Sequence, residues 1–309
     1  IFLKKYKPKR LIIFSRDEQK HFRMQDVYSD DPPSPVRYFL GDVRDLDRLN
    51  FAMRDVDIVI HTAALKHVPL AEYNPFEVVK TNILGAQNII QTAIQNNVKK
   101  VIALSTDKAS SPINLYGATK LASDKLFITA NNFKGKNKTK FSVIRYGNVM
   151  GSRGSVIPFF LKQKEKRILP ITDERMTRFN ITLQEGVNFV ISCFERMWGG
   201  ELFVPKIPSY RIMDIAEAIA PNCKHEIVGI RPGEKLHEEM ITQTDSLNTV
   251  EFKEYYVILP STPLWDVEKF IHDSGPDKGK KLEFGFAYNS VENHDFLSIE
   301  KLKQLISQL

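Results

Sequence analysis

The feature that most constrains the fold is an alternation, over the first 150 residues, of short apolar runs with segments of helical periodicity. Short apolar runs bounded by polar residues predict buried strands. We expect strands at Lys9–Ser15, Val36–Leu40, Asp57–His61, Lys100–Ser105 and Phe141–Tyr146. Helical spacing is found at Asp45–Arg54, Pro75–Asn97 and Asn114–Asn131. Repeated strand–helix–strand units predict an α/β fold with a doubly wound parallel sheet, covered by helices on both faces.

After about residue 151 this alternation stops and prolines become frequent. Helical spacing persists at Leu183–Met197 and at Ile212–Ala220, and the chain from Pro260 on is polar and irregular. We therefore expect a doubly wound domain at residues 1–150. Residues 151–309 are expected to form mainly a smaller α/β lobe and a C-terminal tail.

The composition excludes several classes of protein. The chain has 309 residues, 42% of them hydrophobic, with 44 Lys+Arg against 37 Asp+Glu and a net charge of +7, which is ordinary for a globular domain. No run approaches the roughly 18 to 20 apolar residues of a membrane helix. The two cysteines, Cys193 and Cys223, lie in no motif, which favours a reducing compartment and a cytoplasmic protein. No metal-ligand spacing occurs, so we expect no metal site.

The first ten residues include five basic ones, Lys4, Lys5, Lys7, Lys9 and Arg10. A basic arm can bind nucleic acid or an acidic membrane surface. However, a strand signal follows directly and no aromatic platform accompanies the charges. We expect a solvated helix end that leads into a strand, with neither a nucleic-acid nor a membrane partner.

The most informative segment joins Ser105–Lys108, at the end of a predicted strand, to Tyr116 and Lys120 in the next predicted helix. Residues four apart share one face of a helix, so Tyr116 and Lys120 should lie together. An ammonium near a phenol lowers the phenol's pKa from its usual value of about 10. Such a pair is a base for an alcohol or sugar hydroxyl. Its position also fits, because α/β sheets place their sites at the carboxyl ends of strands.

Several strings of residues together are specific. They are His61–Pro69, Ser105–Lys108, Ile113–Lys120, Arg145–Val149, Gly151–Ser155, Arg175–Phe179 and Arg231–Glu238. On these strings the whole chain resembles the extended short-chain dehydrogenase/reductase family of nucleotide-sugar enzymes, which implies a Rossmann-like sheet. Within that family it is most similar to the inverting UDP-N-acetylglucosamine 4,6-dehydratases. Retaining dehydratases carry an acidic residue where Lys108 stands, and 4-epimerases lack the acid–base pair.

The resemblance implies a mechanism that the residue types support. Tyr116, held as phenolate by Lys120, takes the proton of the sugar 4-hydroxyl while hydride passes from C4 to NADP⁺. Lys108 removes the C5 proton, for which its pKa must be depressed by burial or by cationic neighbours. Asp107 protonates the departing 6-hydroxyl, and Thr106 orients the sugar. Reprotonation of C5 on the opposite face gives inversion, for pseudaminic acid or related surface-glycan synthesis.

The cofactor prediction is NADP, bound by residues 1–150. Ser15 and Arg16 end the first predicted strand and suit a 2′-phosphate, whereas Asp17 leaves NAD open. The family resemblance adds further contacts. They are Asp42, Val43, Ala63, Ala64, Ser105, Tyr116, Lys120, Tyr146 and Asn148.

The implied substrate, UDP-N-acetylglucosamine, carries two phosphates, so cations should line its path. The candidates in the C-terminal half are Arg153, Arg178 and Arg231. Other expected substrate contacts are Lys66, Asn148, Val149, Val156 and Glu234. Glu234 could instead cap the helix that it opens.

One departure from the family's pattern concerns the phosphate-binding turn. The family begins with a strand and a glycine-rich turn that holds the pyrophosphate, but the first glycine here is Gly41. We therefore expect a sheet without its usual first strand, a chain truncated at its N-terminus, and poor NADP affinity with little or no turnover. Open alternatives are a 4-epimerase, a retaining dehydratase or an inactive binding subunit. We also expect a homo-oligomer, with Pro75–Asn97 and Asn114–Asn131 as contact helices.

Overall fold

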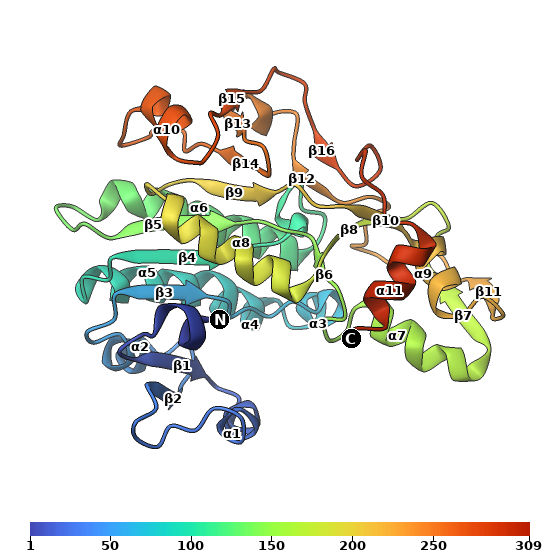
Figure 1. Cartoon of the computed structure of the whole chain (residues 1–309), viewed down its shortest axis with the longest axis horizontal. Helices are drawn as coiled ribbons and strands as arrows, with labels where there is room; N and C mark the ends of the chain where they lie inside the picture. Colours follow the sequence, from blue (N-terminus) through green and yellow to red (C-terminus); the bar gives the residue numbers. More distant parts are fainter.

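The computed structural model describes all 309 residues. Its centre is a seven-stranded sheet with the order β15-β13-β14-β9-β5-β4-β3 (Figure 1). The strands are β3 (Ile58–His61), β4 (Lys100–Leu104), β5 (Lys140–Ile144), β9 (Leu202–Pro205), β13 (Thr249–Glu251), β14 (Tyr255–Ile258) and β15 (Lys280–Lys281). Strands β3, β4, β5 and β9 run parallel, and the C-terminal three join antiparallel.

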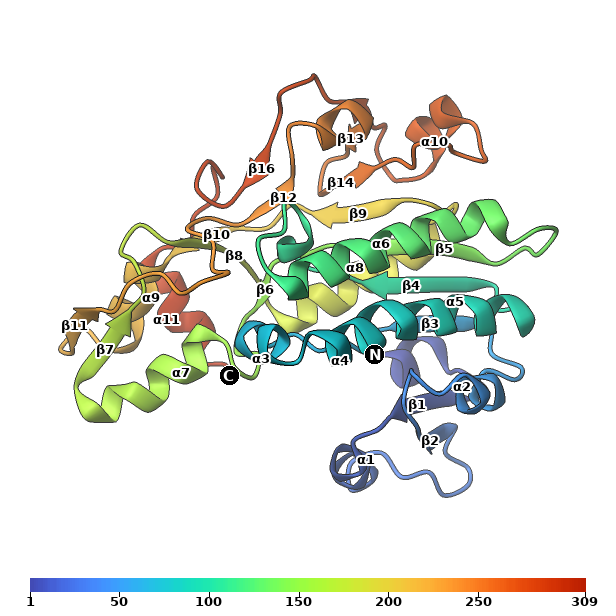
Figure 2. The ribbon, with the colours of Figure 1, turned by 180° about the vertical axis from the view of Figure 1, so that it is seen from behind.

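Helices cover both faces of this sheet. Figures 1 and 2 show α5 (Gly85–Gln95) and α6 (Leu115–Phe133) on one face and α8 (Leu183–Arg196) on the other. Ile90 and Phe127 pack into the core under α5 and α6, whereas Phe194 packs into the core under α8. Because helices cover both faces of the sheet and neither face meets water, the parallel strands have nearly continuous runs of apolar residues.

The two long helices begin at strong caps. The side chain of Asn114 accepts a hydrogen bond from the Gly117 amide at 2.8 Å and starts α6. Thr182 and Glu185 form a reciprocal capping box at the start of α8. The Asn114 cap fixes where α6 begins, and therefore fixes where Tyr116 lies relative to the end of β4.

A separate two-stranded parallel sheet precedes the main one. It pairs β1 (Leu11–Ser15) with β2 (Val36–Leu40). Around it lie η1 (Phe2–Tyr6), α1 (Glu18–Gln25) and α2 (Leu46–Ala52). Because β1 pairs only with β2, and β3 only with β4, the doubly wound sheet is divided between β1 and β3.

A smaller lobe lies beyond the carboxyl ends of the parallel strands (Figure 1). Its strands are β6 (Asn148–Val149), β7 (Ile168–Ile171), β8 (Thr177–Ile181), β10 (Ser209–Arg211) and β11 (Lys224–Ile227). Its helices are α7 (Val156–Gln163), η4 (Lys164–Lys166), α9 (Ile212–Ile219) and α11 (Ile299–Ile306). It has a core of its own, which includes Phe160, Ile215 and Leu302.

The remaining elements connect these parts. They are α3 (Val68–Tyr73), α4 (Pro75–Val79), η2 (Lys80–Leu84), η3 (Asp107–Ala109), β12 (Glu239–Ile241), η5 (Asp245–Asn248), α10 (Val267–Asp273) and β16 (Tyr288–Asn289).

The predicted fold class is confirmed, with two differences in detail. The helix expected over Pro75–Asn97 is divided into α4, η2 and α5. The boundary expected at residue 150 does not divide the sheet. Strand β9 pairs in parallel with β5, with Val143 opposite Leu202, and β13, β14 and β15 extend the same sheet. Residues beyond 151 therefore supply both the small lobe and one side of the central sheet.

Candidate active site

The turn that follows β4 holds a buried carboxyl group. Asp107 is 1% exposed, and its amide donates to the Tyr146 carbonyl oxygen at 3.2 Å. The Thr106 hydroxyl donates to Asp107 Oδ1 at 3.0 Å, while Asp107 Oδ2 is buried without a hydrogen-bond partner. A carboxyl oxygen left free in this way can serve a group that the chain itself does not supply.

The neighbouring Lys108 lies between two carboxylates. Its Nζ is 3.0 Å from Asp107 Oδ1 and 2.9 Å from Glu238 Oε1. Burial opposes the ammonium charge, but Asp107 and Glu238 outweigh it and raise the pKa of Lys108. Our expectation that burial or cationic neighbours depress this pKa is wrong, because the contact with Glu238 could not be seen in the sequence.

Tyr116 lies in the first turn of α6, close to the same cluster. Its side chain is buried, which raises the pKa of the phenol to about 12, although Lys108 and a hydrogen bond with Thr106 act in the opposite direction. The close approach of α6 to η3 depends on Gly117, where a Cβ atom would lie 2.1 Å from the Lys108 carbonyl oxygen. Glycine at this position therefore allows Tyr116 to reach Lys108.

Lys120 shares the buried face of α6 with Tyr116, as the spacing predicts. Its ammonium, however, donates to the Leu104 carbonyl oxygen at 2.8 Å. Burial lowers the pKa of Lys120, and nearby Asp124 opposes this. The expectation that Lys120 holds Tyr116 as a phenolate is therefore not met in this structure. The cation that acts most strongly on the phenol is Lys108.

A buried ionic layer under the site was missed from the sequence. Asp124 accepts from the Ser105 hydroxyl at 2.7 Å and lies 3.5 Å from Arg145 Nη2. Arg145 also donates to the Met240 carbonyl oxygen at 2.9 Å. Ser105, predicted as a cofactor contact, is thus engaged with Asp124. The only signal for Asp124 was its place four residues after Lys120 on the same helix.

The residues predicted to bind the adenosine end of a cofactor lie at the carboxyl ends of β1 and β2. Arg16 Nη1 is 3.4 Å from Asp42 Oδ2, and Arg44 also donates to that carboxylate at 2.8 Å. Asp17 accepts from the Lys20 amide at 3.0 Å and caps α1. The half-exposed guanidinium of Arg16 is therefore the more available of the two charges next to Ser15.

The other predicted cofactor contacts occupy three different settings. Ala63 is exposed and Ala64 half-buried after β3, so both leave room for a ligand. Val43 is buried against Gly85 of α5, where a Cβ atom would lie 2.8 Å from a Val43 methyl group. The ring of Tyr146 packs against the core. Val43 and Tyr146 therefore act mainly in packing.

Only some of the predicted substrate contacts have free polar groups. Arg178 is buried, and its guanidinium donates to the carbonyl oxygens of Leu236 and Lys235, each at 2.9 Å. The prediction that Arg178 binds a phosphate is not supported, because these contacts tie it to the backbone. Arg231 and Glu234 form a bidentate pair, with N–O distances of 2.9 and 3.0 Å.

The remaining substrate candidates surround the loops that follow β3 and β6. Lys66 and Arg153 are exposed, and Val156 begins α7. Asn148 and Val149 form β6, which pairs in parallel with β8. Lys66 and Arg153 are therefore the predicted cations that remain free to meet an anionic ligand.

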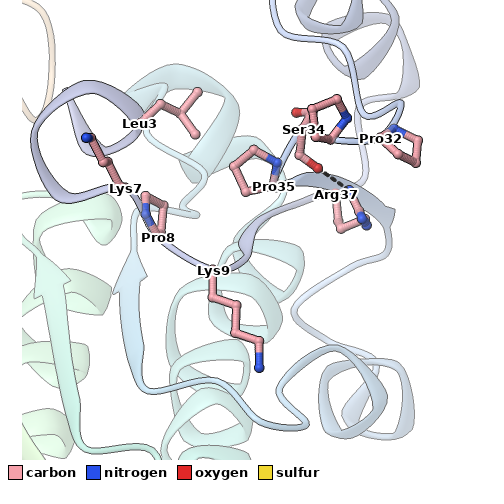
Figure 3. Close-up of a pocket in the computed structure, with 9 residues that line it drawn as sticks. Leu3, Lys7, Pro8, Lys9, Pro32, Ser34, Pro35 and Arg37 are labelled. Atoms are coloured by element: carbon pink, nitrogen blue, oxygen red, sulfur yellow. Dashed lines mark hydrogen bonds between the residues drawn. The ribbon is translucent and has the colours of Figure 1, made fainter.

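A cavity of about 410 Å³ lies elsewhere, at the amino ends of β1 and β2 (Figure 3). Its lining includes Lys7, Lys9 and Arg37, and Arg37 is already bound to the carbonyl oxygen of Ser34. The catalytic candidates lie at the carboxyl ends of parallel strands, so this cavity has no part in the site.

The donor set fits a nicotinamide dinucleotide at its two ends. Arg16 and Ser15 suit a ribose phosphate, and the unpartnered Asp107 Oδ2 and the Tyr116 phenol lie where β4 ends. No group of His, Cys, Asp and Glu is arranged to hold a metal ion. No helix combines the length and apolar character needed to cross a bilayer.

Comparison with known proteins agrees with this site. A family model described as polysaccharide biosynthesis protein matches residues 2–260. The inverting UDP-N-acetylglucosamine 4,6-dehydratase of Campylobacter jejuni is 57% identical, over 99% of this chain and 92% of the relative. The UDP-glucose 4-epimerase of Rickettsia bellii is 39% identical, over 97% of this chain and 87% of the relative.

Solved structures support the fold. Pen from Bacillus thuringiensis superposes with a TM-score of 0.87 at 39% identity, over 97% of this chain and 90% of that one. DesIV, a dTDP-glucose 4,6-dehydratase of Streptomyces venezuelae solved with NAD, has a TM-score of 0.64 at 21% identity, over 74% and 77%. The chain therefore belongs to the polysaccharide biosynthesis protein family, which confirms the predicted resemblance to nucleotide-sugar dehydratases.

Proposed function

We propose that this chain is a hydro-lyase that removes water from UDP-N-acetylglucosamine across C5 and C6 and inverts C5. The observation that carries the proposal is the contact of Lys108 with Asp107, at 3.0 Å, beside the Tyr116 phenol. A base, an acid and a phenol are the groups that such a dehydration requires. The 57% identity to an enzyme of this name supports the same reading.

The ion pair itself supplies both catalytic forms. Moving one proton from Lys108 Nζ to Asp107 Oδ1 converts the pair into a neutral amine and a neutral carboxylic acid. The amine then takes the C5 proton, and the acid protonates the departing 6-hydroxyl so that water leaves. No proton is needed from solvent, which reconciles the raised pKa of Lys108 with its role as a base.

A bound nicotinamide supplies the hydride acceptor for C4 and the hydride donor for C6. Tyr116 accepts the proton of the 4-hydroxyl as a phenolate, after its own proton has been released to solvent. Lys108 favours that loss electrostatically, since its ammonium lowers the pKa of the phenol. Thr106 contacts both Asp107 and Tyr116 and holds the two groups in register.

We propose NADP rather than NAD as the cofactor. Asp17, the residue that left NAD open, is engaged as the cap of α1 and in a 3.4 Å ion pair with Lys20. Arg16 remains half-exposed next to Ser15 and can meet a 2′-phosphate. The DesIV structure was solved with NAD, which supports the nicotinamide class and leaves the 2′-phosphate as our proposal.

A homo-oligomer is proposed as well. Leu70, Tyr73 and Phe76, on α3 and α4, are 62, 85 and 62% exposed and lie in or next to the predicted contact helix. Apolar side chains gathered in this way favour a protein partner, here a second copy of the chain. A cytoplasmic location and a role in pseudaminic acid synthesis stay predictions from the sequence.

The 4-epimerase named among the relatives is the second candidate, and one labelling experiment separates the two. The holoenzyme is incubated with UDP-N-acetylglucosamine that carries deuterium at C4, and the product is read by NMR. A dehydratase moves the label to the C6 methyl group. A 4-epimerase returns it to C4, and an inactive binding subunit leaves the sugar unchanged.

A further inference from the structure

Glu238 is the buried charge at the site that the sequence did not single out. Its side chain is 2% exposed, and Oε1 lies 2.9 Å from Lys108 Nζ. Oε2 is buried without a hydrogen-bond partner. A carboxylate removed from water in this way is costly unless a cation compensates it, so the contact with Lys108 is energetically significant.

The backbone around Glu238 is held rigidly. The Glu238 amide donates to the Ser290 hydroxyl at 2.9 Å. The Ser290 amide in turn donates to the Glu238 carbonyl oxygen at 2.8 Å. Arg178 braces the preceding turn through the carbonyl oxygens of Lys235 and Leu236. The carboxylate of Glu238 is thereby aimed at Lys108 by groups that take no part in the chemistry.

Six charged or titratable groups lie around the Lys108 ammonium: two carboxylates, two cations and two phenols. They are Asp107, Glu238, Arg178, Lys235, Tyr116 and Tyr210. The two carboxylates are the ones in contact with it, whereas Arg178 Nε lies 3.8 Å from Glu238. When Asp107 becomes a neutral acid in the proposed reaction, Glu238 is the anion that remains beside the amine.

We propose that Glu238 is a positioning residue that holds Lys108 beside Asp107 and stabilises the ammonium formed when Lys108 takes the C5 proton. This inference rests on the proposed function for its kinetic consequence. The contact itself can be tested on the free protein. Glu238 acts on Lys108 through their contact at 2.9 Å and has no direct role in the bond changes of the substrate.

The test replaces Glu238 by glutamine, which keeps the shape and an acceptor oxygen but removes the charge. Glu239→Gln is the matched control, because Glu239 accepts from the Ser111 hydroxyl at 3.0 Å and has no contact with Lys108. Lysine side chains are followed by NMR over pH, and the Lys108 signal is identified by its absence in Lys108→Arg. We expect Glu238→Gln to lower the pKa of Lys108 by about 1 to 3 pH units, and Glu239→Gln to leave it unchanged.

A kinetic measurement then asks whether the contact matters to the reaction. Exchange of the C5 proton with solvent deuterium should slow about tenfold in Glu238→Gln, because Lys108 is no longer held beside Asp107 by its 2.9 Å contact with Glu238, while oxidation at C4 and the KM for the sugar change little. An unchanged pKa of Lys108, or an equal loss in both steps, would overturn the proposal. If the wild-type protein does not convert the sugar, the proposed function fails, and the NMR titration still decides the contact.

If the single variant Glu238→Gln does not fold, a double-mutant cycle measured by urea unfolding tests the same contact. Lys108→Met leaves two buried carboxylates without their shared cation and should lose stability to urea. Adding Glu238→Gln to Lys108→Met should restore part of that loss. Strictly additive effects of the two substitutions would overturn the proposal, because residues that interact show coupling.

Discussion

Replacing Arg145 by methionine should destabilise the layer that supports the active site. The Arg145 side chain is 5% exposed, lies 3.5 Å from Asp124 and donates to the Met240 carbonyl oxygen at 2.9 Å. Methionine preserves much of the volume but leaves the Asp124 carboxylate without this partner. Breaking one side of a buried ion pair costs about 3 to 5 kcal/mol. We expect the lower end, about 3 kcal/mol, because Ser105 still donates at 2.7 Å and Lys120 stays near.

The loss should depend on pH with a defined sign. Burial raises the pKa of Asp124 above its ordinary value of 3.8, and Arg145 is the largest influence in the opposite direction. Without Arg145 that pKa rises further, so the folded protein holds a proton over a wider range of pH than the unfolded chain does. Stability is therefore lost progressively as pH increases above 3.8 toward the raised pKa, and the defect is smaller in acid than at neutral pH.

Urea unfolding of four proteins measures this effect: wild type, Arg145→Met, Asp124→Asn and the double variant. The double variant should be more stable than the sum of the single losses predicts, because asparagine no longer needs the cation. Arg175→Met is the control, since its 2.8 Å pair with Asp173 lies at the surface with Arg175 71% exposed, and it should change stability little. Additive losses, or a change below about 1 kcal/mol in Arg145→Met, would refute the reasoning.

Three further changes have defined outcomes. Lys108→Ala should abolish exchange of the C5 proton while oxidation at C4 persists at a reduced rate, because the Tyr116 phenol loses the cation that lowers its pKa; unchanged dehydration measured by product NMR would remove Lys108 from the mechanism. Arg16→Asp should weaken NADP more than NAD, by roughly tenfold or more for a lost charge-assisted contact, as seen by fluorescence titration; equal weakening of both cofactors argues against a 2′-phosphate site. Gly117→Ala places a Cβ atom 2.1 Å from the Lys108 carbonyl oxygen, so turnover should collapse. Gly135→Ala is the control: its Cβ atom would meet no atom within 4 Å, so it measures only the backbone strain of an alanine at a φ of 62°.

The sequence predicted the parallel strands well because their signal is local. The runs at Val36–Leu40 and Lys100–Ser105 are mainly apolar, and they match β2 and β4 within one residue. The strands β13 and β15 have three and two residues, so their pairing depends on contacts with a sheet built elsewhere in the chain. Short strands of this kind carry too little pattern to predict.

The site residues also divide into those whose sequence signal is local and those that depend on distant contacts. Asp107, Lys108 and Tyr116 could be grouped from a strand end and a helix start that adjoin in the sequence. Glu238 could not, since its contact with Lys108 joins residues 130 positions apart. The predicted direction of the Lys108 pKa failed for that reason.

The central claim is that the chain dehydrates UDP-N-acetylglucosamine and inverts C5. The most direct measurement is the NMR structure of the product formed by the holoenzyme in deuterium oxide. The account predicts a 4-keto-6-deoxy sugar with deuterium at C5 and the configuration at C5 inverted. A product with C5 retained, or a C4 epimer without deuterium, would contradict it.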